Sequence, residues 1–172
     1  MFSIPPLPPW SALHPLVVHF PIVLLLIAPF FLALALFLPR VKAKHAVFTG
    51  FALVVIGTGF LFLTVETGDA AAEAVAKTPE IKSVLHDHEE LAETTQVVFG
   101  TLTFLLAALL FGPRLFKREI KIRSFRTVLS IFLLAYVGGA LVLANTAHAG
   151  GRLVHELGVT AKITSASGSS IK

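Results

Sequence analysis

Four long apolar runs constrain what this chain can fold into. They cover about residues 14–38, 45–65, 91–112 and 127–149. Each run is close to the ~20 residues that an α-helix needs to cross a hydrocarbon core of ~30 Å. Of the 172 residues, only 14% are charged, whereas a soluble domain carries about 25%. The runs therefore predict an all-α integral membrane protein, built as a four-helix up-and-down bundle.

The segments outside the runs predict a simple domain organisation. Residues 1–12 are expected to form a Pro-rich N-terminal arm, and residues 13–160 the transmembrane domain. Residues 161–172, rich in Ser and Gly, are expected to be a disordered tail. We find no convincing internal repeat in the sequence.

Helix start and stop signals refine the third and fourth spans. Thr78-Pro79-Glu80 is typical of a helix start, so the third helix is expected to begin outside the membrane and to continue as the span. Gly112-Pro113 is expected to end this span, and Gly150-Gly151 to end the fourth.

Charge distinguishes the two ends of the bundle. The loops after the first and third spans hold nine of the fourteen Lys and Arg residues. The loop after the second span, the helical extension and the C-terminal tail hold nine of the ten Asp and Glu residues. The positive-inside rule places the basic loops in the cytoplasm. We therefore expect a multi-pass protein with both termini outside the cytoplasm.

Six of the seven histidines lie at the outer, acidic end: His14, His19, His86, His88, His148 and His155. From the 1.5 Å rise per residue, His14 and His88 stand ~36 Å above the basic end, His148 ~32 Å and His19 ~28 Å. These four histidines come from three helices and fall in one layer. Ionisable side chains at membrane depth are costly, so by default they indicate a functional site.

Imidazoles from facing helices suit the axial ligation of haem b. The absence of cysteine excludes thiolate-held clusters and covalent c-type haem within this chain. We predict one or two haems bound through four ligands, with two further histidines in second rank: His14, His19, His88 and His148, then His86 and His155.

The pairing of the ligands stays open at this stage. Heights favour His14 with His88 and His19 with His148, whereas His19 with His88 would join diagonally opposite helices. His14 and His19 are about 140° apart around a helix, so they cannot easily bind one iron together.

Two other interpretations compete with haem binding. His86 and Glu90 share a helical face and could hold Zn²⁺ or Cu²⁺ in a His-based metal-binding membrane protein. Alternatively, the chain is a cofactor-free structural or anchor subunit of a respiratory membrane complex. The sequence contains no metalloprotease motif, Ser/His/Asp arrangement, phosphate-cradling loop or nucleic-acid-binding pattern.

The stretch Leu13-His14-Pro15-Leu16-Val17-Val18-His19-Phe20-Pro21 resembles the opening motif of the bacterial membrane family catalogued as domain of unknown function 2231. The similarity continues at His88-Glu89 and at Gly150-Gly151-Arg152-Leu153-Val154, and it covers about residues 11–160. His155 departs from the family, in which an aromatic residue is usual. The resemblance implies a four-helix domain of the bacterial inner membrane, often found beside Rieske or cytochrome modules.

These observations lead to one leading hypothesis. The chain is expected to be a b-type cytochrome subunit that carries electrons rather than a stand-alone enzyme. Its partners would be a quinone or another membrane protein and an extracytoplasmic redox protein such as a cytochrome c or a Rieske protein. His45 is the only histidine at the basic end, so we expect no electron transfer across the membrane by this chain alone.

Overall fold

The structure, a computed structural model, describes residues 7–75, 78–117 and 120–160. This part of the chain contains helices and no strands. After a 3-10 turn, η1, come five α-helices: η1 Trp10–Ala12, α1 His14–Val17, α2 His19–Phe37, α3 Arg40–Glu73, α4 Pro79–Leu115 and α5 Ile122–His155. Four helical segments are long and apolar enough to cross a membrane, with α1 and α2 together forming the first. The expected all-α membrane bundle is confirmed, whereas the expected disordered tail lies outside the described residues.

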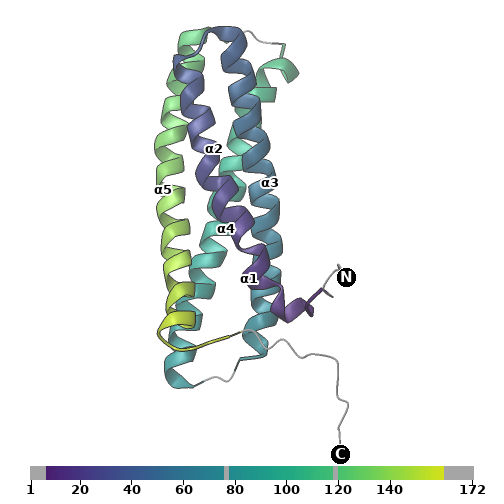
Figure 1. Ribbon diagram of the computed structural model, residues 1–172. Coiled ribbons are helices and arrows are strands. Elements are labelled where there is room, and N and C mark those ends of the chain that lie inside the picture. Colours follow the sequence, from purple (N-terminus) through teal and green to yellow (C-terminus); the bar gives the residue numbers. More distant parts are fainter. Residues whose placement is uncertain (1–6, 76–77, 118–119, 161–172) are drawn as a thin grey trace, which may run out of the picture.

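The helices form an up-and-down bundle (Figure 1). Each of α2, α3 and α4 packs against the next helix in the chain, and α5 packs against α2, so α2 and α4 are diagonal to one another. The α2–α3 connection lies at the top of Figure 1. At the other end lie η1, α1, the start of α4 and the end of α5, and we call this the histidine end.

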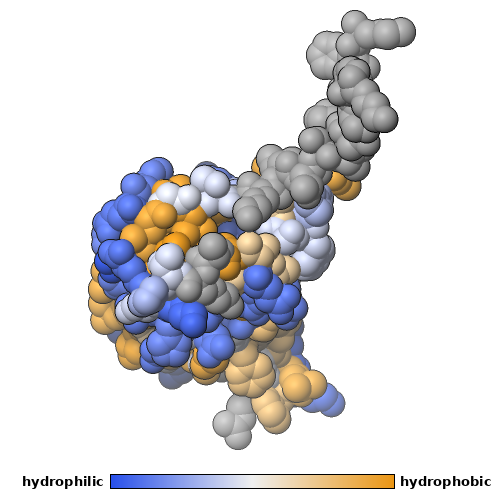
Figure 2. Space-filling model, turned by 90° about the horizontal axis from the view of Figure 1, so that it is seen from below, coloured by the Kyte–Doolittle hydropathy of each residue, from blue (hydrophilic) through white to orange (hydrophobic). Residues whose placement is uncertain are grey.

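The bundle is apolar both inside and outside. Leu25, Phe99 and Leu129 are fully buried in its core. Phe30, Phe104 and Leu134 are 71–74% exposed, although each lies within a span. Contiguous apolar surface of this kind is rare on soluble monomers and suits contact with lipid. The histidine end differs, since blue, hydrophilic residues dominate it in Figure 2.

Two predicted helix ends are wrong, and one predicted helix start is confirmed. The hydroxyl of Thr78 accepts a hydrogen bond from the Ile81 N–H at 3.3 Å, as an N-cap does. Helix α4 continues through Gly112-Pro113 to Leu115, because a proline in the last turn removes only one intrahelical bond. Helix α5 continues through Gly150-Gly151 to His155. Gly150 serves close packing instead, as described below.

Proline in α2 creates a polar contact inside the core. Pro29 has no N–H to donate to the Leu25 carbonyl one turn earlier. The buried Tyr136 hydroxyl of α5 donates to that carbonyl at 2.8 Å. A neighbouring helix thus satisfies the backbone group that proline leaves without a partner, as a bilayer requires.

Candidate functional site

His14 and His88 lie next to each other at the histidine end. His14 begins α1, and His88 lies in the third turn of α4. The two rings therefore come from diagonal spans of the bundle. Their centroids are 6.4 Å apart, and their planes are nearly perpendicular at 87°. Both side chains are half-buried. This is the one histidine pair from the sequence-predicted set whose rings the structure brings together.

Each imidazole is held by a backbone carbonyl of the next membrane span in the chain, α3 for His14 and α5 for His88. Nδ1 of His14 donates to the Thr64 carbonyl of α3 at 2.9 Å. Nδ1 of His88 donates to the Thr146 carbonyl of α5 at 3.0 Å. A carbonyl can only accept, so the proton of each neutral ring is on Nδ1 and the lone pair is on Nε2. Ligating histidines are oriented in this way by outer-shell partners.

Glycine makes the approach to each carbonyl possible. Gly68 and Gly150 stand four residues after Thr64 and Thr146. A Cβ at Gly68 would be 3.1 Å from two atoms of the His14 ring, and one at Gly150 would be 3.0 Å from Cε1 of His88. Such contacts are too close for a side chain to be added without moving the ring. A histidine, a threonine carbonyl and a glycine therefore form one unit, which we call a half-site.

Buried hydroxyl groups support the second half-site. Thr95 of α4 is fully buried, and its hydroxyl contacts the Thr146 hydroxyl at 2.8 Å. The Leu91 carbonyl lies 2.7 Å from the Thr95 hydroxyl, and the Val142 carbonyl lies 3.0 Å from the Thr146 hydroxyl. One hydroxyl therefore donates to the other, and the second donates to a backbone carbonyl. In the first half-site the buried Thr67 hydroxyl donates to the Thr64 carbonyl at 3.0 Å. The polar groups beside the two rings thus have partners, and this fixes the carbonyls that hold the imidazoles.

The two half-sites belong to a structural repeat. Helices α3 and α5 share the spacing Gly-x6-Thr-x3-Gly, as Gly57, Thr64 and Gly68 and as Gly139, Thr146 and Gly150. Eleven residues after each histidine lies a fully buried side chain, Leu25 or Phe99. Leu25 packs on Gly57 and Phe99 on Gly139. The same arrangement of histidine, buried side chain, threonine and glycines therefore occurs twice. It occurs once in the first hairpin, formed by α1 to α3, and once in the second hairpin, formed by α4 and α5.

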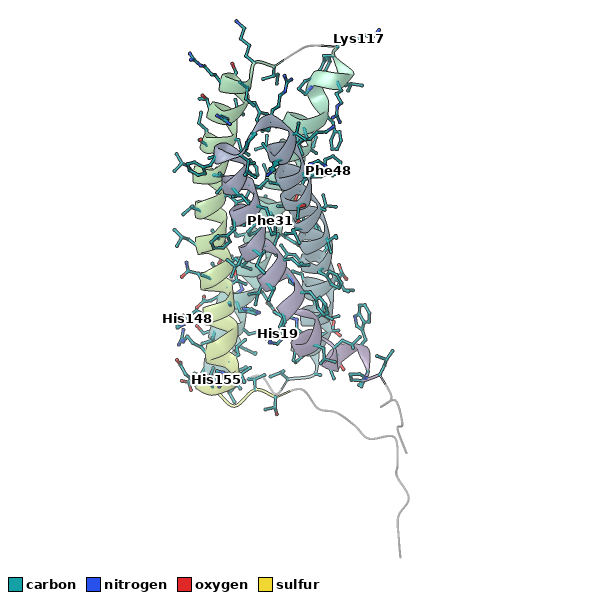
Figure 3. All side chains as sticks on the ribbon, turned by 45° about the horizontal axis from the view of Figure 1, so that its top comes forward. His19, Phe31, Phe48, Lys117, His148 and His155 are labelled. Atoms are coloured by element: carbon teal, nitrogen blue, oxygen red, sulfur yellow. The ribbon has the colours of Figure 1, made fainter. Side chains whose placement is uncertain are left out.

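The other predicted ligands are not brought together. His19 is exposed, and its Nδ1 bonds the Pro15 carbonyl of its own chain segment at 2.9 Å. His148 and His155 are exposed on α5, at the same end as His19 (Figure 3). His86 is exposed on α4. Within the described ranges no group of three or more His, Cys, Asp or Glu side chains has the geometry to hold a metal ion.

The sequence alone predicts no role beside the imidazoles for the residues that hold them. Thr64, Gly68, Thr146 and Gly150 carry no charge and resemble ordinary helix-packing residues. The available signal was the shared Gly-x6-Thr-x3-Gly spacing in the second and fourth spans.

Fold and site together define a polytopic α-helical membrane protein with a paired-imidazole site at one end of its bundle. The chain belongs to the family described as predicted membrane protein (DUF2231), whose model matches residues 11–162. The resemblance found at the opening motif is thereby confirmed. No curated protein and no solved structure matches the chain.

Proposed function

We propose that the protein is a b-type cytochrome subunit that binds one haem b between His14 and His88. The observation that carries this proposal is the pair of hydrogen bonds from Nδ1 to the Thr64 and Thr146 carbonyls. They leave two Nε2 lone pairs, one from each of two diagonal helices. Histidine is a common haem ligand, and two imidazoles would suffice to hold a haem iron, whereas a closed zinc site takes four ligands.

The distance between the rings supports this assignment. A bond from a metal ion to imidazole is about 2.0–2.1 Å long, and the nitrogen is about 1.1 Å from its ring centre, so two trans imidazoles have centres about 6.3 Å apart. The observed separation of the two centroids is 6.4 Å. The separation of the His14 and His88 rings therefore matches the distance expected for two imidazoles that would hold one iron.

Bound haem would supply a one-electron couple, and the chain's residues would set its position and its surroundings. The Thr64 and Thr146 carbonyls would raise the electron-donating strength of the imidazoles through Nδ1. The site lies at the acidic end of the bundle. Electrons would then pass between a quinone or membrane partner and an extracytoplasmic redox protein, such as a cytochrome c or a Rieske protein. The basic end would face the cytoplasm of the bacterial inner membrane.

The test is haem content in the purified full-length protein. After expression with ample haem, we expect about one haem per chain and a reduced b-type α band. His14→Ala and His88→Ala should each lose most of the haem, because each removes one axial ligand. His19→Ala and His148→Ala are the matched controls, and they should retain it because both side chains are exposed and unpaired with another imidazole.

Two outcomes would contradict the proposal. If the controls lose as much haem as His14→Ala and His88→Ala, the ligand assignment is wrong. Protein that co-purifies with respiratory subunits but contains no haem or metal would instead support a structural or anchor subunit.

A further inference from the structure

A cavity lies at the end of the bundle opposite the histidines. It has a volume of about 270 Å³ and is lined by residues from α3, α4 and α5. Three cationic side chains line it: Arg40, Lys44 and Arg114. A second hollow shares Arg40, Ile120 and Ile122 with the first and adds Lys121. Four cations thus surround one continuous region.

These cations have no carboxylate partner in the part of the chain that the structure describes. Among residues 7–75, 78–117 and 120–160, no acidic residue lines either hollow. The ion pair Arg152–Glu156 is at the histidine end, and no other is present among the described residues. The side chains of Arg40, Lys44, Arg114 and Lys121 are all exposed. Their charge is therefore available to an anion.

Two helix N-termini add to this positive potential. Helix α3 begins at Arg40 and helix α5 at Ile122, and both of these residues line the cavity. Neither N-cap residue, Pro39 or Lys121, forms a side-chain cap, and neither first turn contains an acidic residue. The first N–H groups of both helices lack partners within the helix and carry partial positive charge. Phosphate groups bind at such termini.

The rest of the lining is apolar: Val47, Phe48, Leu109, Leu110 and Phe125. The apolar lining would not stabilise free phosphate, because a water-soluble anion has no apolar surface to bury against it. A phospholipid matches both parts, with its phosphate at the cations and an acyl chain against the apolar wall. Basic pockets between transmembrane helices bind anionic lipid headgroups in this manner.

We propose that this cavity is a binding site for one anionic phospholipid of the leaflet at the basic end. Its phosphate lies among Arg40, Lys44 and Arg114, near the N-termini of α3 and α5. An acyl chain packs along Phe48 and Leu109. The site is independent of the histidine pair and does not require haem.

The test uses the full-length protein, stripped of lipid in a neutral detergent. Retained lipid is counted by native mass spectrometry after titration with phosphatidylglycerol, phosphatidylcholine or glycerol phosphate. We expect one tightly retained phosphatidylglycerol per chain and much weaker retention of the other two. Arg40→Gln, Lys44→Gln and Arg114→Gln should each weaken retention about fivefold, the value expected for loss of one cation near an anionic headgroup.

Lys42→Gln is the matched control. Lys42 is exposed and lies between Arg40 and Lys44 at the start of α3, but it lines neither hollow. It should leave retention of phosphatidylglycerol unchanged. An equal loss in Lys42→Gln would mean that diffuse surface charge binds the lipid, and this would overturn the site. Equal retention of phosphatidylcholine would overturn the preference for an anion, and equal binding of glycerol phosphate would overturn the assignment to a lipid.

Discussion

The side chains of His14 and His88 differ from the other histidines in what their Nδ1 atoms contact. His19 and His45 bond carbonyls one turn back in their own segments. His14 and His88 bond carbonyls of other helices. A hydrogen bond across helices fixes the direction of the ring relative to the bundle, and this pre-organises Nε2 for a ligand.

Gly68 and Gly150 provide a test of this arrangement that leaves both histidines intact. Gly68→Ala and Gly150→Ala place a methyl group 3.1 Å and 3.0 Å from the imidazoles, so each ring must shift by a few tenths of an ångström. We expect haem affinity to fall roughly 10–100-fold, the range seen when outer-shell partners of ligating histidines are changed. Haem titration and the reduction potential of the bound haem measure the effect.

Gly59 and Gly151 supply the controls for that experiment. A Cβ at either position meets no atom within 4 Å. Gly59→Ala and Gly151→Ala should keep haem affinity and stabilise the helices by up to about 1 kcal/mol each. If all four alanine variants bind haem alike, close packing at Gly68 and Gly150 does not position the rings.

At the scale of whole elements, a buried hydrogen bond joins α2 and α5 within their apolar interface. The Tyr136 hydroxyl donates to the Leu25 carbonyl that Pro29 leaves without an N–H partner. Tyr136→Phe should destabilise the bundle by about 1–3 kcal/mol, because a buried carbonyl loses its only donor. The ring itself keeps its contacts with Phe99 and Phe132. Unfolding in detergent measures the change.

A second substitution separates this explanation from a general packing defect. Pro29→Ala restores an N–H that can donate to the Leu25 carbonyl. In that background Tyr136→Phe should cost much less than in the native chain, which a double-mutant cycle detects as a coupling energy. Equal costs in the two backgrounds would refute the proposed role of the hydroxyl.

For the molecule as a whole, the difference in charge between the two ends of the bundle predicts which end faces the cytoplasm. The chain has no cysteine, so single cysteines can be introduced as labels. Lys42 and Glu80 are both exposed, at opposite ends of the bundle. In intact spheroplasts, a membrane-impermeant thiol reagent should label Glu80→Cys and should label Lys42→Cys only after the cells are opened. Labelling in the reverse order would invert the orientation and place the histidine site on the cytoplasmic side.

The sequence predicts most of the fold, because membrane spans need long apolar runs and these are visible in a single chain. Helix ends are harder to predict. Gly150 beside Gly151 has the sequence pattern of a helix end. Its role is instead to leave space for the ring of His88, which lies on another helix and is distant in sequence. No local pattern carries that information. Tertiary packing thus reverses a local signal at this position.

The site was predictable only in part. The estimated heights of the histidines along the spans made His14 and His88 one of the candidate pairs. The structure brings these two rings together. The heights cannot show that His19 is exposed, since the direction of a side chain depends on how α1 and α2 rotate against their neighbours. The repeat was missed because equivalent buried positions hold different residues, such as Leu25 and Phe99.

Each histidine is held by the helix that completes its own hairpin, so each hairpin carries a finished half-site. The chain is in this respect an intramolecular dimer, with the proposed haem-binding position at the interface of its two halves. A ligand held by both Nε2 atoms binds only when the hairpins are docked, so ligand binding and docking are thermodynamically linked. Any substitution that loosens the packing of α2 on α5 or of α3 on α4 will therefore weaken ligand affinity, even far from the imidazoles.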